Sequence, residues 1–282
     1  WTTSDVTFDG VYATGNIAGL RTVGGTSSST FTTIKNSSFI DNNVMSVDTV
    51  GGNDDSGAFG ILVNGGKVLV ENNLFSGQEA HSYDYGRDGA AVEFYQGGSG
   101  SIVRKNRSTS NDAFTETDPS ANNISYIQNH IAWNGAHATG LVLTGTGYVV
   151  LHNTIYLPTD GTHGPITDPL RGAQAVISTA SLTLRNNIII GGWKAVYVPS
   201  APTSYGYNDY LGQVQNVPIT STDLNQVNPL LVSATDRHET AGSPTIDAGD
   251  PAALEANVSD TDMDDTYVPT GTARDIGVDE YE

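Results

Sequence analysis

A short pattern built around asparagine recurs through the chain and constrains its fold more than any other feature. It reads as apolar, polar, Asn and a second apolar pair, in TTIKNSSF, VLVENNLF, SIVRKNRS, ISYIQNHI, VVLHNTIY and LTLRNNII. Its register mark falls on Ser37, Asn73, Asn106, Asn129, Asn153 and Asn187. Successive marks are therefore 36, 33, 23, 24 and 34 residues apart, a period typical of solenoid proteins.

We interpret the shortest spacing as one coil of about 23 residues, extended elsewhere by loop insertions. Stacked coils place short parallel strands about 4.8 Å apart, and an asparagine in a tight turn can then bond the same amide one coil away. An antiparallel sandwich would instead need two-residue hairpin turns, which are scarce here. The sequence thus predicts an all-β fold, a right-handed parallel β-helix, with a C-terminal cap.

A second family of expected strands lies earlier in each coil. Its members begin at Gly60, Ala91, Ala113, Gly140, Ala175 and Ala195. The three long coils carry their extra residues just before these strands, at 43–58, 78–88 and 158–172. Stacking would put the insertions on one edge of the solenoid, where loops on a rigid scaffold can wall a groove.

Two regions are expected, and they are continuous with each other. Residues 1–200 form the coils, and residues 201–282 form a closing coil and an acidic cap over the open end of the solenoid. The chain begins in mid-pattern, because DVTFDGVY already reads as a strand. We therefore expect Trp1 to be a processing boundary, with further domains upstream.

The charge balance excludes several classes of partner. The formal net charge is −19, from 12 Lys and Arg against 31 Asp and Glu. Such a chain is not expected to bind nucleic acid or anionic lipid, which require a basic face. No apolar run reaches the roughly 20 residues of a membrane helix, so no membrane insertion is expected. The absence of cysteine excludes disulfides and thiol chemistry.

The coil pattern is joined near the C-terminus by the phrases NNIIIGG, NQVNPLLV, SPTIDAGDP and DIGVDEYE. With them the chain resembles the secreted bacterial parallel β-helix proteins, a group that includes polysaccharide lyases, glycoside hydrolases and uronate epimerases. The resemblance implies an extracellular or cell-surface location and a polysaccharide or surface glycan as partner. The same scaffold also hosts adhesins, so the fold alone does not define an activity.

Glu93 and Glu116 are the candidate catalytic pair. They are 23 residues apart, and each lies 13 residues before its own mark, Asn106 or Asn129. In that register the two residues stack about 4.8 Å apart, a spacing that suits a retaining glycosidase, whereas a wider gap suits an inverting one. A register that matches Ala91 with Ala113 would instead turn Glu116 to the other face. Other readings are a calcium-bridged pair or two solvated carboxylates.

Further polar side chains surround this pair in the sequence. A basic group beside a Tyr or His suits β-elimination at a uronate as well as hydrolysis. Alternatively, these bases balance nearby acids on a solvated sheet. The candidates are His81 and Tyr83 for catalysis, and Arg87, Asp88, Arg104, Lys105, Asp112 and His137 for substrate binding.

The segment DTDMDD offers the one expected metal site. Asp260, Asp262 and Asp264 have an alternate-carboxylate spacing that can wrap calcium, which prefers oxygen ligands. A solvated acidic loop is the other interpretation. Calcium is the only cofactor that the sequence suggests.

These observations predict a secreted carbohydrate-active protein that cleaves a polysaccharide by glycoside hydrolysis or β-elimination. The alternative is a non-catalytic adhesin, fibre or surface module that binds glycans. The repeat and the acidic surface are compatible with both.

Overall fold

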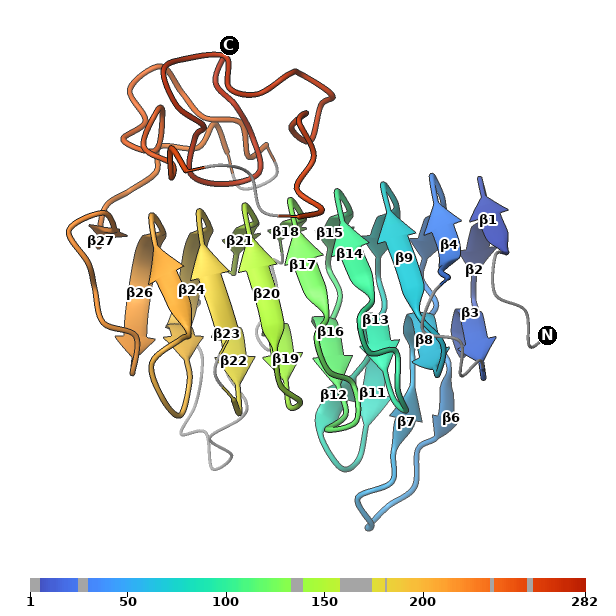
Figure 1. Cartoon of the computed structure of the whole chain (residues 1–282). Coiled ribbons are helices and arrows are strands. Elements are labelled where there is room, and N and C mark those ends of the chain that lie inside the picture. Colours follow the sequence, from blue (N-terminus) through green and yellow to red (C-terminus); the bar gives the residue numbers. More distant parts are fainter. Residues whose placement is uncertain are drawn as a thin grey trace.

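The chain forms a right-handed parallel β-helix, as the repeat predicts (Figure 1). The computed structural model describes residues 6–24, 30–132, 139–157, 174–180, 182–233, 236–252 and 256–282. Three stacks of strands run along the solenoid, and each coil contributes one strand to each stack. Within the described residues no helix occurs that is long and apolar enough to cross a membrane.

The first stack is a separate sheet of eight strands, all paired in parallel. It consists of β1 (Thr7–Asp9), β4 (Thr32–Lys35), β9 (Val68–Glu71), β14 (Ile102–Arg104), β17 (Ser125–Ile127), β20 (Tyr148–Leu151), β23 (Leu182–Arg185) and β25 (Ser204–Gly206).

The other two stacks join into one fifteen-stranded sheet through a long strand, β24 (Ile188–Tyr197). The second stack holds β2 (Tyr12–Thr14), β5 (Ser38–Ile40), β10 (Leu74–Ser76), β15 (Arg107–Thr109), β18 (His130–Ala132) and β21 (Thr154–Tyr156). The third stack holds β3 (Ala18–Val23), β8 (Phe59–Asn64), β13 (Ala90–Phe94), β16 (Ala113–Thr117), β19 (Thr139–Leu143) and β22 (Gln174–Ser178). The last coil adds β26 (Asp209–Gln215) and β27 (Leu224–Asn225).

The predicted asparagine ladder runs through the turns between the first and second stacks. The backbone N–H of Asn106 donates to Oδ1 of Asn129 (3.1 Å), and the N–H of Asn129 donates to Oδ1 of Asn153 (2.9 Å). Each rung also reaches back one coil, as when Nδ2 of Asn129 donates to the carbonyl of Val103 (2.8 Å). The ladder continues past the predicted marks to Asn208 and Asp223. These bonds satisfy buried polar groups that would otherwise be costly.

The residue before each rung from Ser37 to Asn208 adopts the left-handed region with positive φ. This conformation recurs at Asn36, Asn72, Lys105, Gln128, His152, Asn186 and Tyr207. It is uncommon for residues other than glycine, and the repeated ladder bonds fix it here in every coil. The side chains at this position therefore line one edge of the solenoid, which we call the turn edge.

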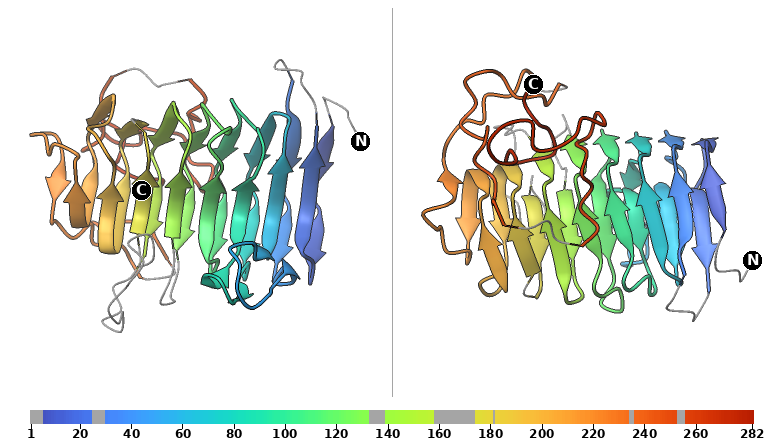
Figure 2. Two further views of the ribbon diagram at one scale, coloured as in Figure 1. Left: turned by 90° about the horizontal axis from the view of Figure 1, so that it is seen from below. Right: turned by 45° about the horizontal axis from the view of Figure 1, so that its top comes forward.

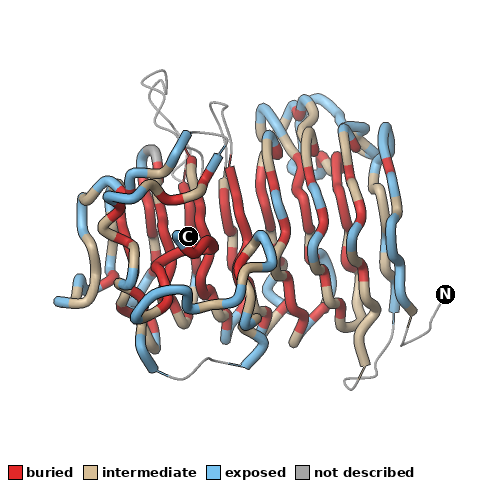
Figure 3. The backbone as a smooth tube through the Cα atoms, turned by 90° about the horizontal axis from the view of Figure 1, so that it is seen from above, coloured by how far each residue is buried: buried red, intermediate tan, exposed pale blue. Residues whose placement is uncertain are grey.

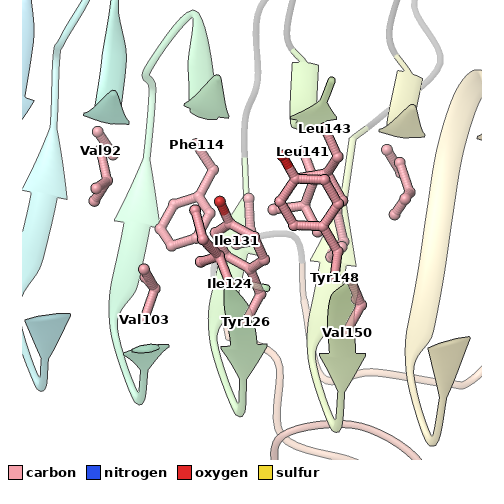
Figure 4. Packing of buried hydrophobic residues seen from close by; sticks show 14 of the residues in the cluster. Val92, Val103, Phe114, Ile124, Tyr126, Ile131, Leu141, Leu143, Tyr148 and Val150 are labelled. Atoms are coloured by element: carbon pink, nitrogen blue, oxygen red, sulfur yellow. The ribbon is translucent and has the colours of Figure 1, made fainter. Parts of the chain in front are cut away.

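Apolar side chains and a few hydrogen-bonded polar ones fill the interior (Figures 3 and 4). Tyr126 and Tyr148 are fully buried, and their hydroxyls bond the side chains of Thr115 (3.2 Å) and Thr117 (2.8 Å). Thr115 and Thr117 of β16 thus point inward. Because side chains alternate along a strand, Glu116 between them points outward.

The described residues of the segment 228–282 do not close the open end of the solenoid as expected. They fold back and lie against the turn edge of the middle and later coils (Figures 1 and 2). Lys105 donates to Asp265 (2.7 Å), Gln128 donates to the carbonyl of Thr261 (2.8 Å), and Arg185 forms an ion pair with Asp250. Acidic side chains of this segment are paired with basic side chains at the turn edge and directly beside it, as Asp265 with Lys105 and Asp250 with Arg185.

Candidate functional site

Glu93 and Glu116 are register partners on adjacent parallel strands, β13 and β16. The competing register, which would pair Ala91 with Ala113, does not occur, because Ala113 pairs with Ala90. Flanking positions Val92 and Phe94 belong to the core, so Glu93 points outward like Glu116. Neighbouring parallel strands place the two residues about 4.8 Å apart. The register prediction is confirmed.

The outward row containing this pair is otherwise largely apolar. Leu62 of β8 precedes Glu93, and Val142 of β19 follows Glu116 in register. Glu93 itself is half-buried. Burial raises its pKa well above the ordinary value, and the charges of Glu116, Asp88 and Asp118 raise it further. A carboxyl group in this setting keeps its proton to higher pH than an ordinary carboxyl group does, as a general acid requires.

Two antiparallel hairpins stand beside the pair, at the predicted positions of the first two insertions. One joins β6 (Met45–Val47) with β7 (Ser56–Gly57), and the other joins β11 (Ala80–Ser82) with β12 (Gly86–Asp88). They are locked together where Asp55 accepts hydrogen bonds from Ser82 Oγ (2.9 Å) and from the N–H of Asp84 (3.0 Å). The third predicted insertion lies outside the described residues.

The second hairpin carries four of the predicted site residues. His81 contacts the ring of Tyr83 edge-on, with 4.7 Å between centroids, and lies 3.6 Å from a carboxylate oxygen of Asp48. Arg87 forms an ion pair with Glu79. Asp88 ends the hairpin and is close enough to Glu93 to raise its pKa. Of the four, Asp88 is the one that the electrostatics connect directly to the carboxylate pair.

The remaining substrate-binding candidates are placed differently. Asp112 precedes β16, where its N–H donates to the carbonyl of Gln78 (3.1 Å). His137 lies outside the described residues. Arg104 and Lys105 belong to the first stack and its turn edge, and the structure does not bring them to Glu93.

Arg104 and Lys105 instead hold the C-terminal segment in place. Arg104 pairs with Glu71 (2.6 Å) and donates to the carbonyl of Asn257 (3.1 Å). Lys105 Nζ donates to Thr261 Oγ1 (2.8 Å) as well as to Asp265. Because the chain turns between β13 and β14, residues about eleven positions after Glu93 face another side of the solenoid. Their partners give them a structural role.

The acidic segment predicted to bind calcium is engaged in local contacts. Asp262 is buried, and its Oδ1 accepts from the N–H groups of Asp264 (2.8 Å) and Thr266 (2.9 Å). Asp264 pairs with Arg107 and with His238. Calcium binding by Asp260, Asp262 and Asp264 remains a prediction.

Two other groups of side chains have ligand atoms within 4.8 Å of one another. Within the described part of the chain these are Asp54, Asp55 and Asp84 between the hairpins, and His238, Asp264 and Asp279 in the C-terminal segment. The first group already accepts hydrogen bonds from its own loops, including Asp84 from the N–H of Asp54 (2.7 Å). Neither group needs a metal to explain its geometry.

Sequence reasoning missed an aromatic and cationic cluster on the same outward face. Glu116 is followed in register by Val142, Ile177 and Tyr197, so Tyr197 of β24 lies in the row of the carboxylate pair. The Lys194 ammonium lies 4.2 Å from the Tyr197 ring centroid and 4.4 Å from that of Trp193. Among the described residues Lys194 has no carboxylate partner, and burial lowers its pKa. The signal in the sequence was WKAVY, where Trp193 and Lys194 are adjacent and Tyr197 follows three residues later.

Fold and site together define a parallel β-helix protein with an outward carboxylate pair. Comparison with protein-family models and with curated proteins gives no match to this chain. The functional argument therefore depends on the geometry of the site.

Proposed function

We propose that this chain is an extracellular glycoside hydrolase that binds a polysaccharide along the outward face of β13, β16, β19, β22 and β24. Glu93 is the general acid, and Glu116 is the nucleophile. The observation that carries the proposal is the register pairing of these two outward glutamates, one of which has a strongly raised pKa.

The spacing supports a retaining mechanism. Carboxyl groups of retaining enzymes are about 5 to 5.5 Å apart, close to the spacing of adjacent parallel strands. Glu93 would give its proton to the glycosidic oxygen while the Glu116 carboxylate attacks the anomeric carbon and the bond to the leaving sugar breaks. Glu93, now ionised, would then take a proton from the water that releases the sugar from Glu116.

The location of the basic residues favours hydrolysis over β-elimination. Elimination at a uronate needs a cation to neutralise the sugar carboxylate beside the base. Arg87, Arg104 and Lys105 were the candidates for that role. Arg104 and Lys105 contact the C-terminal segment instead, and Arg87 is paired with Glu79. Lys194 lies farther along the same face, beside Tyr197, which is three strand spacings or about 14 Å from Glu116 in register.

The cluster of Trp193, Lys194 and Tyr197 is proposed to bind sugar units distant from the cleaved bond. Aromatic rings offer apolar faces to the C–H groups of a sugar ring, and Trp193 is 41% exposed. Lys194 adds a positive charge in an otherwise acidic protein. An acidic or hydroxyl-rich polysaccharide is thus the partner that this face suits.

The test is turnover on a panel of neutral and uronate-containing polysaccharides. Glu93→Gln, with folding confirmed by circular dichroism, is expected to abolish the release of reducing ends. Full activity in this variant would remove Glu93 from the mechanism. Unsaturated products from the wild-type chain would indicate elimination, and binding without any product would indicate the adhesin or surface module.

A further inference from the structure

A buried guanidinium lies between the C-terminal segment and the second strand stack. Arg237 is 1% exposed, and its carbon Cζ lies 3.8 Å from the ring centroid of Tyr156 on β21. Nη1 donates to the carbonyl of Ser233 (2.6 Å). Arg237 has no carboxylate partner among the described residues, so its charge is not compensated by an ion pair.

The side of Arg237 that carries Nε and Nη2 has no acceptor in the described structure. These two atoms form the planar fork that matches the two oxygens of a carboxylate, phosphate or sulfate. A buried polar group without a partner is costly, and a buried charge more so. The fork therefore requires an acceptor that the described residues do not supply.

A second unpartnered group lies in the same place. Nε2 of His130 on β18 is buried without a hydrogen-bond partner, and His130 is 6% exposed. β18 pairs with β21 so that Ala132 is opposite Tyr156, the residue on which Arg237 stacks. His130 lies two residues before Ala132 on the same strand and therefore points to the same outward side. The charge of Arg237 is the strongest electrostatic influence on His130 after burial, followed by Arg107 and His238.

The other charged side chains nearby are paired with one another. Arg107 is paired with Asp264, and His238 with Asp236 and Asp264, whereas Arg237 and His130 have unused polar atoms. An apolar group at this position would leave the fork unpaired, whereas an oxyanion would accept hydrogen bonds from it.

We propose that Nε and Nη2 of Arg237, together with Nε2 of His130, bind a small oxyanion at the interface between the C-terminal segment and β18–β21. The ligand class is a carboxylate, phosphate or sulfate. Its role is to fasten the C-terminal segment to the solenoid, on a face other than that of Glu93. The site is independent of the proposed glycoside hydrolysis.

The test compares thermal unfolding of the full chain in phosphate, acetate and chloride at equal ionic strength. Phosphate stabilises many proteins without binding, so the variant Arg237→Met and the exposed control Arg21→Met are measured in parallel. We expect phosphate or acetate to raise the midpoint saturably by about 2 to 4 °C or more in the wild type and in Arg21→Met. Arg237→Met should lose this increment.

An equal increment in Arg237→Met, or none above chloride in the wild type, would overturn the proposal. If Arg237→Met does not fold, calorimetric titration of the wild-type chain with inorganic phosphate decides. Saturable binding supports the site, and no binding up to about 10 mM contradicts it.

Discussion

Glu93 and Glu116 face outward from adjacent parallel strands as direct register partners, and the pKa of Glu93 is raised by burial and by the charge of its partner. At this spacing two carboxylate charges repel each other, so ionisation of both glutamates is energetically unfavourable in a half-buried row. Ionisation of one carboxyl group therefore disfavours ionisation of the other, which is one cause of the raised pKa of Glu93.

The first prediction concerns the stability effect of that proton. Because the folded-state pKa of Glu93 is raised, its contribution to stability is full below the unfolded pKa of about 4.3 and is lost as pH rises toward the folded value. Glu93→Gln, which stays neutral, should raise the unfolding midpoint near pH 7 and change it little at pH 4. Calorimetry at both pH values measures this. An unchanged or lower unfolding midpoint of Glu93→Gln near pH 7 would contradict the destabilisation that we ascribe to ionised Glu93.

The pH dependence of activity follows from the same shift. The proposed mechanism requires Glu93 protonated, so the alkaline limb of the rate profile is expected to report its raised pKa. Glu116→Gln removes the proposed nucleophile and should lower activity by several orders of magnitude. It also removes the like charge, so the pKa of Glu93 should fall in this variant, which NMR titration of the carboxyl groups can follow. A pKa of Glu93 that is the same in Glu116→Gln would argue against the coupling.

Removal of one ladder rung should destabilise the solenoid. Asn129→Ala removes the oxygen that accepts hydrogen bonds from the backbone N–H and from Nδ2 of Asn106. It also removes the side-chain amide that donates to the carbonyl of Val103. Buried groups left unpaired cost about 1–3 kcal/mol each, so we expect a loss of about 3 kcal/mol or more in denaturant unfolding. Asn53→Ala, in an exposed loop, is the matched control and should stay within about 0.5 kcal/mol of wild type.

Lys194 and Arg104 are expected to have different functions. Lys194→Met is expected to weaken glycan binding several-fold, because the cation on the carboxylate face is lost. Arg104→Met should leave binding unchanged and increase protease cleavage within 228–282, because Arg104 contacts that segment. Affinity electrophoresis and limited proteolysis give the two readouts. The reverse result would return Arg104 to the substrate site.

Attachment of the C-terminal segment should weaken as pH rises. Burial raises the pKa of Glu239 to about 10, of Glu280 to about 7 and of Asp279 to about 6. For carboxyls with raised pKa, stability is greatest below the unfolded value of about 4 and declines as pH passes through each folded value. Relative to the backbone amides of the asparagine ladder, those of 228–282 should therefore exchange faster at pH 9 than at pH 5.

His238 acts in the same direction. Burial alone would lower its pKa, but hydrogen bonds to Asp236 and Asp264 outweigh that effect and raise it to about 9. Its contribution is complete below the unfolded value of about 6.5 and is lost as pH rises through 9. His238→Gln should reduce the change in exchange between pH 7 and pH 9, and equal protection at both pH values in the wild type would refute this account.

The ladder and the glutamate register could be predicted because both depend on a local count. Glu93 and Glu116 each lie 13 residues before a rung, and no insertion interrupts either interval. The position of Lys105 could not be read in this way, since its partner Asp265 is 160 residues away in the chain. The aromatic cluster was also hidden, because β24 runs without a break from the second stack into the third.

Successive rungs of the ladder are separated by as few as 15 and as many as 36 residues, yet the hydrogen bonds between them are nearly the same length. The number of residues between two rungs thus varies widely without a change in the hydrogen bonds of the ladder. Hairpins such as β11–β12 could be lengthened, shortened or exchanged between coils while the strands beneath keep their partners. The outer surface of the solenoid can therefore change in one coil at a time while the strand pairing is retained.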